Sequence, residues 1–220
     1  MKRFFYLIST LLLIACADDV ETPAHQLLTE ARSALAQNDF DEARALIDSL
    51  RTAYPKAVNA RREALAFADS IELVQAKHDW QLADSVKSFK VFELADLKSK
   101  FVLEKDAKYQ SVGNYVTPEQ AGDKSRFKYF SEVNEQGTMM LVSVDAQRKY
   151  HPTEIDVTGD SFEGVYPAGF SSVDVSAFNQ CYALAKLFKD VKEATEAEEK
   201  FAMKIKFYER KIQENSNSGK

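Results

Sequence analysis

The chain has 220 residues, of which 29 are lysine or arginine and 34 are aspartate or glutamate, so its formal net charge at pH 7 is −5. Nucleic acid is not an expected partner, because phosphates attract clustered basic residues and this chain is acidic. Its hydrophobic content of 45%, with seven glycines and five prolines, is typical of a globular protein with one large or two small domains.

Residues 1–15 have the pattern of a secretory signal peptide. Lys2 and Arg3 precede an apolar run from Phe4 to Ile14, which is too short to cross a bilayer as a mature helix. An uncleaved anchor is the alternative. Removal of these residues leaves 27 basic against 34 acidic side chains, a net charge of −7. We therefore expect the mature protein to lie beyond the cytoplasmic membrane.

The signal ends in Leu13-Ile14-Ala15-Cys16, which resembles the lipobox of bacterial lipoproteins. The resemblance implies a mature chain that starts at Cys16 and carries a diacylglyceryl thioether and an N-acyl group, so that its partner is the membrane. Three acyl chains make such attachment practically permanent. An ordinary signal peptide with a chance cysteine is the alternative. Residues 16–24 are then a lipidated tether.

The tether is acidic, with Asp18, Asp19 and Glu21. An acidic run at this place resembles the signal that sends lipoproteins of some Gram-negative gut anaerobes to the outer face of the outer membrane. The resemblance implies an outer-membrane location, with the cell surface and the periplasmic face both left open.

Residues 25–56 have the 3.6-residue period of two short helices, separated at Asn38-Asp39. The spacing resembles one tetratricopeptide unit, although the expected large aromatic residue of its first helix is absent. A single unit of this kind cannot bury its own apolar face and needs a packed neighbour. The positions that fit the repeat are Leu27, Ala31 and Ala34 in the first helix, and Phe40, Ala43, Ile47 and Pro55 in the second.

Residues 57–105 are predicted to form a single long helix, because no glycine or proline occurs between Lys56 and Leu103. Apolar residues spaced by threes and fours form the stripe of a helix that lies along a partner. The stripe consists of Phe67, Ile71, Val74, Leu82, Val86, Phe89 and Leu97.

Residues 176–213 are predicted to form the partner helix, with Ser176 as its N-cap and 214–220 as a disordered tail. Its apolar residues are Leu184, Phe188, Val191, Thr195, Ala202, Ile205 and Ile212. The predicted fold class is α+β: an N-terminal helical hairpin and two long antiparallel coiled-coil helices with a small antiparallel β domain inserted at the tip. A bundle in which both helices fold back on the hairpin is the alternative.

Residues 106–175 are predicted to form the inserted β domain of four or five strands. The alternating stretches 126–133 and 138–144 flank the turn Asn134-Glu135-Gln136-Gly137 and indicate a first hairpin. A second hairpin is predicted over 153–158 and 161–166. The dense aromatic residues of this domain are expected to form its core more often than a ligand site.

The region from about 70 to 212 is similar to uncharacterised lipoproteins of gut anaerobes. The likeness rests on Lys108-Tyr109-Gln110-Ser111-Val112-Gly113-Asn114-Tyr115, on Tyr150-His151-Pro152-Thr153-Glu154-Ile155-Asp156-Val157, and on the returning lysine-rich helix. It implies architecture and location, and it transfers no functional residue.

No catalytic signature, phosphate-binding glycine loop or metal-ligand spacing occurs, so neither cofactor nor metal is expected. The histidines His25 and His78 are expected to be structural, and Cys181 is expected to be packed in the core. The candidate ligand surface, centred on the strand after Tyr150, consists of Tyr150, His151, Glu154 and Asp156. An acid–base pair of Glu154 and Asp156 is the enzymatic alternative.

The sequence thus predicts a non-enzymatic, lipid-anchored scaffold or binding protein of the cell envelope, which presents its β module to a protein or glycan partner. The rival hypotheses are an envelope hydrolase that uses the carboxylates and His151, and a docking subunit that uses the helical hairpin.

Overall fold

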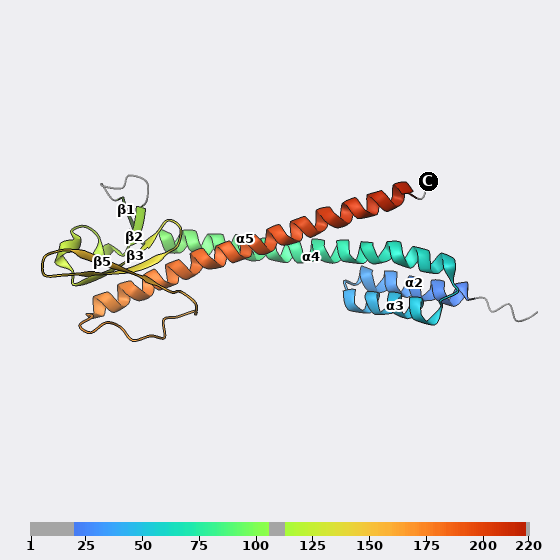
Figure 1. The fold of residues 1–220 in the computed structure, drawn as a ribbon, viewed down its shortest axis with the longest axis horizontal. Coiled ribbons are helices and arrows are strands. Elements are labelled where there is room, and N and C mark those ends of the chain that lie inside the picture. The colour runs from blue at the N-terminus through green and yellow to red at the C-terminus, as the bar shows by residue number, and fades with distance from the viewer. Residues whose placement is uncertain (1–19, 106–112, 219–220) are drawn as a thin grey trace, which may run out of the picture. The chain divides into compact units, whose positions relative to one another are not determined.

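The computed structural model describes residues 20–105 and 113–218, so Cys16 and the predicted signal peptide lie outside the described residues. The chain divides into two compact units: a first unit of residues up to 79 together with 201 onward, and a second unit of residues 80–200. The predicted α+β class is confirmed, with a helical hairpin, two long helices, and an antiparallel sheet between them in the chain (Figure 1).

The helical hairpin consists of α2 (Glu21–Ala36) and α3 (Phe40–Ala53), and Figure 1 shows the two helices side by side. The predicted tether 16–24 is therefore too long, because α2 already begins at Glu21. Asn38 in the turn has φ +60°, and the Asp39 carboxylate caps α3 by accepting from the Glu42 N–H at 3.1 Å. Ala31 and Ala43 are fully buried, as the close approach of two helices requires.

The hairpin packs against the first part of α4 (Val58–Lys98), a continuous helix of 41 residues. α4 is therefore the packed neighbour that a single helical hairpin needs, because the three helices share one core. Its largest members are Leu28, Leu50, Ile71 and the partly buried Phe67.

The predicted helix 57–105 is wrong at its C-terminal end, because α4 stops at Lys98. The last turn tightens, with the Lys100 N–H bound to the Leu97 carbonyl and the Ser99 hydroxyl bound to the Asp96 carbonyl. The chain then enters β1 (Val102–Lys105), whose backbone pairs with a strand further along. That pairing overrides the local helical pattern.

The last helix, α5 (Ser172–Ser218), has 47 residues and begins before the predicted N-cap at Ser176. Ser171 and Asp174 cap it reciprocally: the Asp174 N–H donates to the Ser171 hydroxyl at 3.2 Å, and the Ser171 N–H donates to the Asp174 carboxylate at 2.8 Å. Ser176 lies inside the helix. The predicted disordered tail is also partly wrong, since α5 continues through 214–218.

Ion pairs join α4 and α5 within each unit. In the first unit the Lys211 ammonium lies 2.6 Å from the Asp69 carboxylate. In the second unit Lys87 contacts Glu198 at 2.5 Å, and Lys90 contacts Asp190 at 3.6 Å. Within the second unit, α4 and α5 are therefore antiparallel, as predicted, because the later residue of α4 contacts the earlier residue of α5.

The sheet of the second unit is a five-stranded antiparallel meander in the order β1-β2-β3-β4-β5. Besides β1 its strands are β2 (Gly113–Val116), β3 (Tyr129–Asn134), β4 (Met139–Val144) and β5 (Tyr150–Ile155). The first predicted hairpin is confirmed as β3 and β4, whose turn is held by the Asn134 side chain, which accepts the N–H groups of Gln136 and Thr138.

The second predicted hairpin is wrong in its second half. Its first half becomes β5, which pairs with β4, but residues 161–166 form no strand. Phe162 and Tyr166 instead pack their rings on Phe178 of α5, with centroids 4.7 and 5.5 Å away. Aromatic burial here outweighs the local preference for a strand.

The core of the second unit lies between α5 and one face of the sheet (Figure 1). Phe178, Cys181 and Leu184 of α5 are at most 1% exposed and meet Val133 of β3 and Met139 of β4. Since strand residues alternate between faces, the neighbouring positions point to the opposite, open face.

Candidate ligand site

A hollow of about 320 Å³ lies on the open face of the sheet, and we call it the sheet hollow. Its apolar lining comes from adjacent strands: Phe130 of β3, Val142 of β4, and Tyr150 and Pro152 of β5. Phe130 is only 3% exposed and forms the floor, whereas Tyr150 is 49% exposed. Their rings meet edge to face with centroids 5.7 Å apart, so Tyr150 is held at the side of the hollow and remains available to a ligand.

Polar side chains complete the lining of the sheet hollow, and they come from β1, β2, β3 and the segment between β2 and β3. They are Glu104 and Lys105 of β1, Asn114 of β2, Lys124 of the 3₁₀ turn η2 (Lys124–Arg126), and Glu132 of β3. Carboxylates, an amide and ammonium groups therefore surround an aromatic floor.

Lys124 is fixed in place by three contacts. Its ammonium lies 2.8 Å from the Glu104 carboxylate, donates to the Gln120 carbonyl at 2.6 Å, and stands 5.3 Å from the centre of the Phe130 ring. This preorganised cation lowers the entropy cost of binding, because the side chain is already ordered.

The chemistry of the lining favours binding of a polar ligand with an apolar face. Aromatic rings stack on the apolar faces of sugars or hold peptide side chains, and carboxylate and amide groups receive their hydroxyl or N–H donors. The described residues that line the sheet hollow contain no histidine, cysteine or serine. The volume is at the small end of the range for ligand sites, which suits one or two units of a chain molecule.

The four residues of the predicted ligand surface are not gathered in one site. Only Tyr150 lines the sheet hollow. Glu154 and Asp156 line a second groove of about 550 Å³, beside Phe188 and Lys189 of α5. β5 ends at Ile155, so Asp156 does not continue the strand as predicted.

His151 belongs to neither the sheet hollow nor the second groove. Its Nε2 lies 2.9 Å from the Asp145 carboxylate in the turn before β5. The hydrogen bond to His151, together with the N–H groups of Lys149 and Gln147, lowers the pKa of the Asp145 carboxyl. This contact closes the turn between β4 and β5.

The remaining candidate residues have structural surroundings. His25 lies 3.7 Å from Glu21, and the His78 ring packs against Phe40 at 5.7 Å. Cys181 is fully buried, as predicted, and burial raises the pKa of its thiol well above the ordinary value. Across residues 20–105 and 113–218, no group of three or more His, Cys, Asp or Glu side chains is placed to hold a metal ion.

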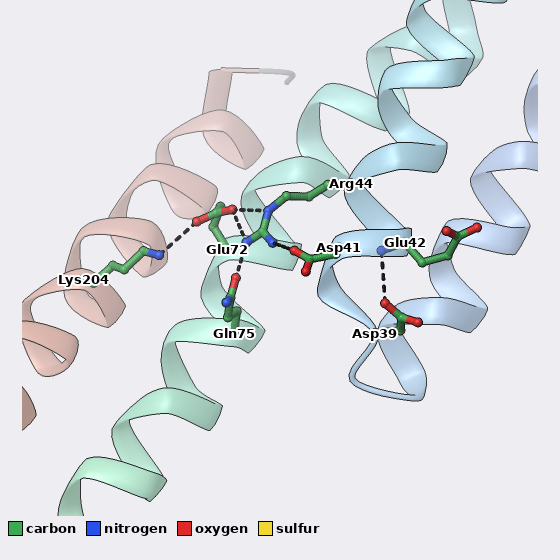
Figure 2. A network of polar contacts seen from close by, with 7 residues as sticks. All are labelled: Asp39, Asp41, Glu42, Arg44, Glu72, Gln75 and Lys204. Carbon is green, nitrogen blue, oxygen red and sulfur yellow. Dashed lines mark hydrogen bonds and ion pairs between the residues drawn. The ribbon is translucent and has the colours of Figure 1, made fainter.

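A polar network in the first unit involves residues that the sequence analysis did not single out (Figure 2). The Arg44 guanidinium of α3 donates to the Glu72 carboxylate of α4 at 2.6 and 2.8 Å and also to Gln75. The other Glu72 oxygen lies 3.0 Å from the Lys204 ammonium of α5. Burial alone would raise the pKa of Glu72, but Arg44 and Lys204 outweigh it and lower that pKa. The network joins three helices, and its groups satisfy one another.

Protein-family models, curated proteins and solved structures were compared with the chain, and none of them matches it. Within the described residues, no helix combines the length and apolar composition that a membrane span requires. Function is therefore inferred from the chemistry of the chain's own residues.

Proposed function

We propose that this protein is a lipid-anchored binding protein of the cell envelope, which uses the sheet hollow to hold a protein or glycan partner. The observation that carries the proposal is the sheet hollow itself, where a half-exposed tyrosine stands over a buried aromatic floor inside a polar rim. The lipobox-like end at Cys16 supports the anchor.

The contacts of the rim support a ligand with hydroxyl or N–H groups. Lys124 already neutralises Glu104, so the ion pair presents a fixed dipole to the ligand and no uncompensated charge. Tyr150 contributes both an apolar ring and a hydroxyl. Recognition by one aromatic anchor and several polar groups is typical of small binding sites.

The predicted hydrolase used His151, Glu154 and Asp156 in a single site. His151 in β5 is bound to Asp145 of the preceding turn, and the two carboxylates line the second groove, so their arrangement gives no support to that rival.

Binding is tested by applying the full-length protein, in mild detergent, to arrays of oligosaccharides and of short peptides. We expect Tyr150→Ala to reduce binding at least about tenfold, as loss of an aromatic hot spot does. Val165→Ala is the matched control, since Val165 is 95% exposed in the same unit but outside the sheet hollow. Equal binding by the Tyr150→Ala protein, or no binding to either array, would contradict the proposed site.

The anchor is tested separately by feeding expressing cells a labelled fatty acid. Cys16→Ser should lose both the label and the membrane-bound fraction, whereas Cys181→Ala, which removes the chain's other cysteine, should keep both. A labelled Cys16→Ser protein would show that the attachment is elsewhere.

A further inference from the structure

An exposed apolar face runs along α4 in the second unit, at residues that the sequence analysis assigned to the contact with α5. Leu82 is 56% exposed, Val86 53%, Phe89 59% and Phe92 71%. We call these four residues the α4 stripe. Their spacing of four, three and three residues places them on one side of the helix. The predicted contact of Leu82, Val86 and Phe89 with α5 is therefore wrong.

Lysines of the same helix segment are engaged in ion pairs, and Lys90 pairs with Glu93 at 2.9 Å. Lys87 and Lys90 reach Glu198 and Asp190 of α5. The exposed residues of 81–95 are all uncharged: they are Gln81, Leu82, Ser85, Val86, Ser88, Phe89, Val91, Phe92 and Ala95. The segment thus directs two lysines toward α5 and the α4 stripe outward, while Leu94 packs against the core of the second unit.

The exposed area of the α4 stripe is on the order of 500 Å², which reaches the size of the largest apolar patches on ordinary monomers and marks an interaction surface. If two copies cover this face together, they bury roughly 1,000 Å² in total, which is about the lower limit for a specific interface.

We propose that the α4 stripe pairs with the α4 stripe of a second copy of this chain, in an antiparallel arrangement about a two-fold axis near residue 87. In this register Phe89 packs against Ser85 of the second copy, and Phe92 packs against Leu82 of the second copy. The Phe89 ring then meets a small side chain and the Phe92 ring meets an apolar one, as interdigitated helix packing requires. A two-fold axis makes both contacts occur twice.

The charges also favour a second copy as the occupant. The chain carries a net charge of −5, which opposes association of identical molecules at most of its surface. The four side chains of the α4 stripe are uncharged, and the neighbouring Lys90 and Glu93 neutralise each other at 2.9 Å, so this face is repelled less. A lipid surface is a poorer occupant, because helices that lie on membranes carry free lysine or arginine beside the apolar face, and Lys87 and Lys90 are engaged by α5.

The pairing is tested with single cysteines in the full-length protein in its own membranes, using a short bismaleimide crosslinker. Ser88→Cys lies next to the proposed axis and should give a product of twice the chain mass. Ser99→Cys is the matched control, since Ser99 is also exposed but would lie about 35 Å from its own counterpart. The native Cys181 is buried, and the parent protein reports any background from it or from Cys16.

We expect the double-mass product to be at least ten times more abundant for Ser88→Cys than for Ser99→Cys. Adding Phe89→Asp should remove it, and circular dichroism should show an unchanged fold because Phe89 is largely exposed. Equal products for the two cysteines, a product that contains another protein, or a product that survives Phe89→Asp would overturn the proposal.

Discussion

Gly137, in the turn between β3 and β4, lies directly against the ring of Phe188 on α5. A Cβ atom added at Gly137 would stand 2.8 Å from the Phe188 Cγ, well inside van der Waals contact. The glycine also has φ +84°, a left-handed conformation that side chains disfavour. One small residue therefore satisfies the turn and lets the hairpin approach the helix.

Replacement of Gly137 by alanine should lower the free energy of unfolding by about 3 kcal/mol, since overpacking adds to the cost of the backbone conformation. Gly122→Ala is the matched control, because Gly122 has φ +90° but no neighbour within 4 Å of an added Cβ. It should cost only about 1 kcal/mol. Urea unfolding followed by the fluorescence of Trp80 measures both. Similar losses for the two variants would show that Phe188 does not restrict the turn.

Glu21 at the start of α2 caps the start of α4. Its two carboxylate oxygens accept the N–H groups of Asn59 and Ala60, both at 3.1 Å. The bond from Ala60, followed by that from Asn59, lowers the pKa of Glu21 below its ordinary value of 4.5. The contribution of Glu21 to stability is therefore fully present above that value and is lost as the pH falls through the lower, folded-state pKa.

Glu21→Gln should make the stability of the first unit less dependent on pH below 4.5, because the amide keeps one acceptor oxygen but has no charge to lose. Thermal unfolding followed by circular dichroism at a series of pH values measures the difference. Glu30→Gln on the same helix is the control, since Glu30 accepts only a side-chain bond from Gln26 among the described contacts. Parallel pH profiles for Glu21→Gln and the parent protein would refute the cap.

Elements that form from residues close together in the sequence could be predicted. Elements that depend on contacts between residues far apart in the sequence could not. The β3–β4 hairpin follows from alternation and a turn within one short stretch. By contrast, β1 exists because Val102 and Leu103 pair with β2, and no local pattern distinguishes them from the end of a helix. Residues 161–166 look like a strand until the partner of their aromatic rings, Phe178, is known.

The candidate site shows the same division. Tyr150 could be singled out as a candidate, because an aromatic residue just before a predicted strand is visible in the sequence. Phe130 and Glu104 were missed as ligand-site residues, since only the register of β1, β2, β3 and β4 brings them to the same face as Tyr150.

Cys181 should be unreactive in the folded protein, because its thiol is buried in the core and burial raises its pKa. Iodoacetamide should modify it at least about a hundredfold more slowly than the exposed cysteine of Ser99→Cys, until urea unfolds the second unit. Mass spectrometry of the peptides that contain residues 99 and 181 measures both rates. Comparable rates in the native protein would show that the core opens readily.

Pro152 protects the open edge of the sheet. The Asp145 N–H donates to the Lys149 carbonyl at 3.0 Å, which identifies this pair as a hydrogen-bonded one. Hydrogen-bonded and non-hydrogen-bonded pairs alternate along antiparallel strands. The N–H groups of His151 and Thr153 therefore point toward β4, and the nitrogen of Pro152 points outward. At this outward position proline has no N–H to offer to another strand.

Pro152→Val should therefore create an edge donor and promote association through β5, beyond the assembly state of the parent protein. Thr153→Val is the matched control, because it adds a similar branched apolar side chain but leaves the outward N–H groups unchanged. Sedimentation velocity over a range of concentrations measures association, and urea unfolding checks that both variants are folded. If the two variants associate equally, side-chain hydrophobicity is the cause and the edge argument is wrong. If only Pro152→Val associates, the missing N–H of Pro152 is what keeps β5 unpaired.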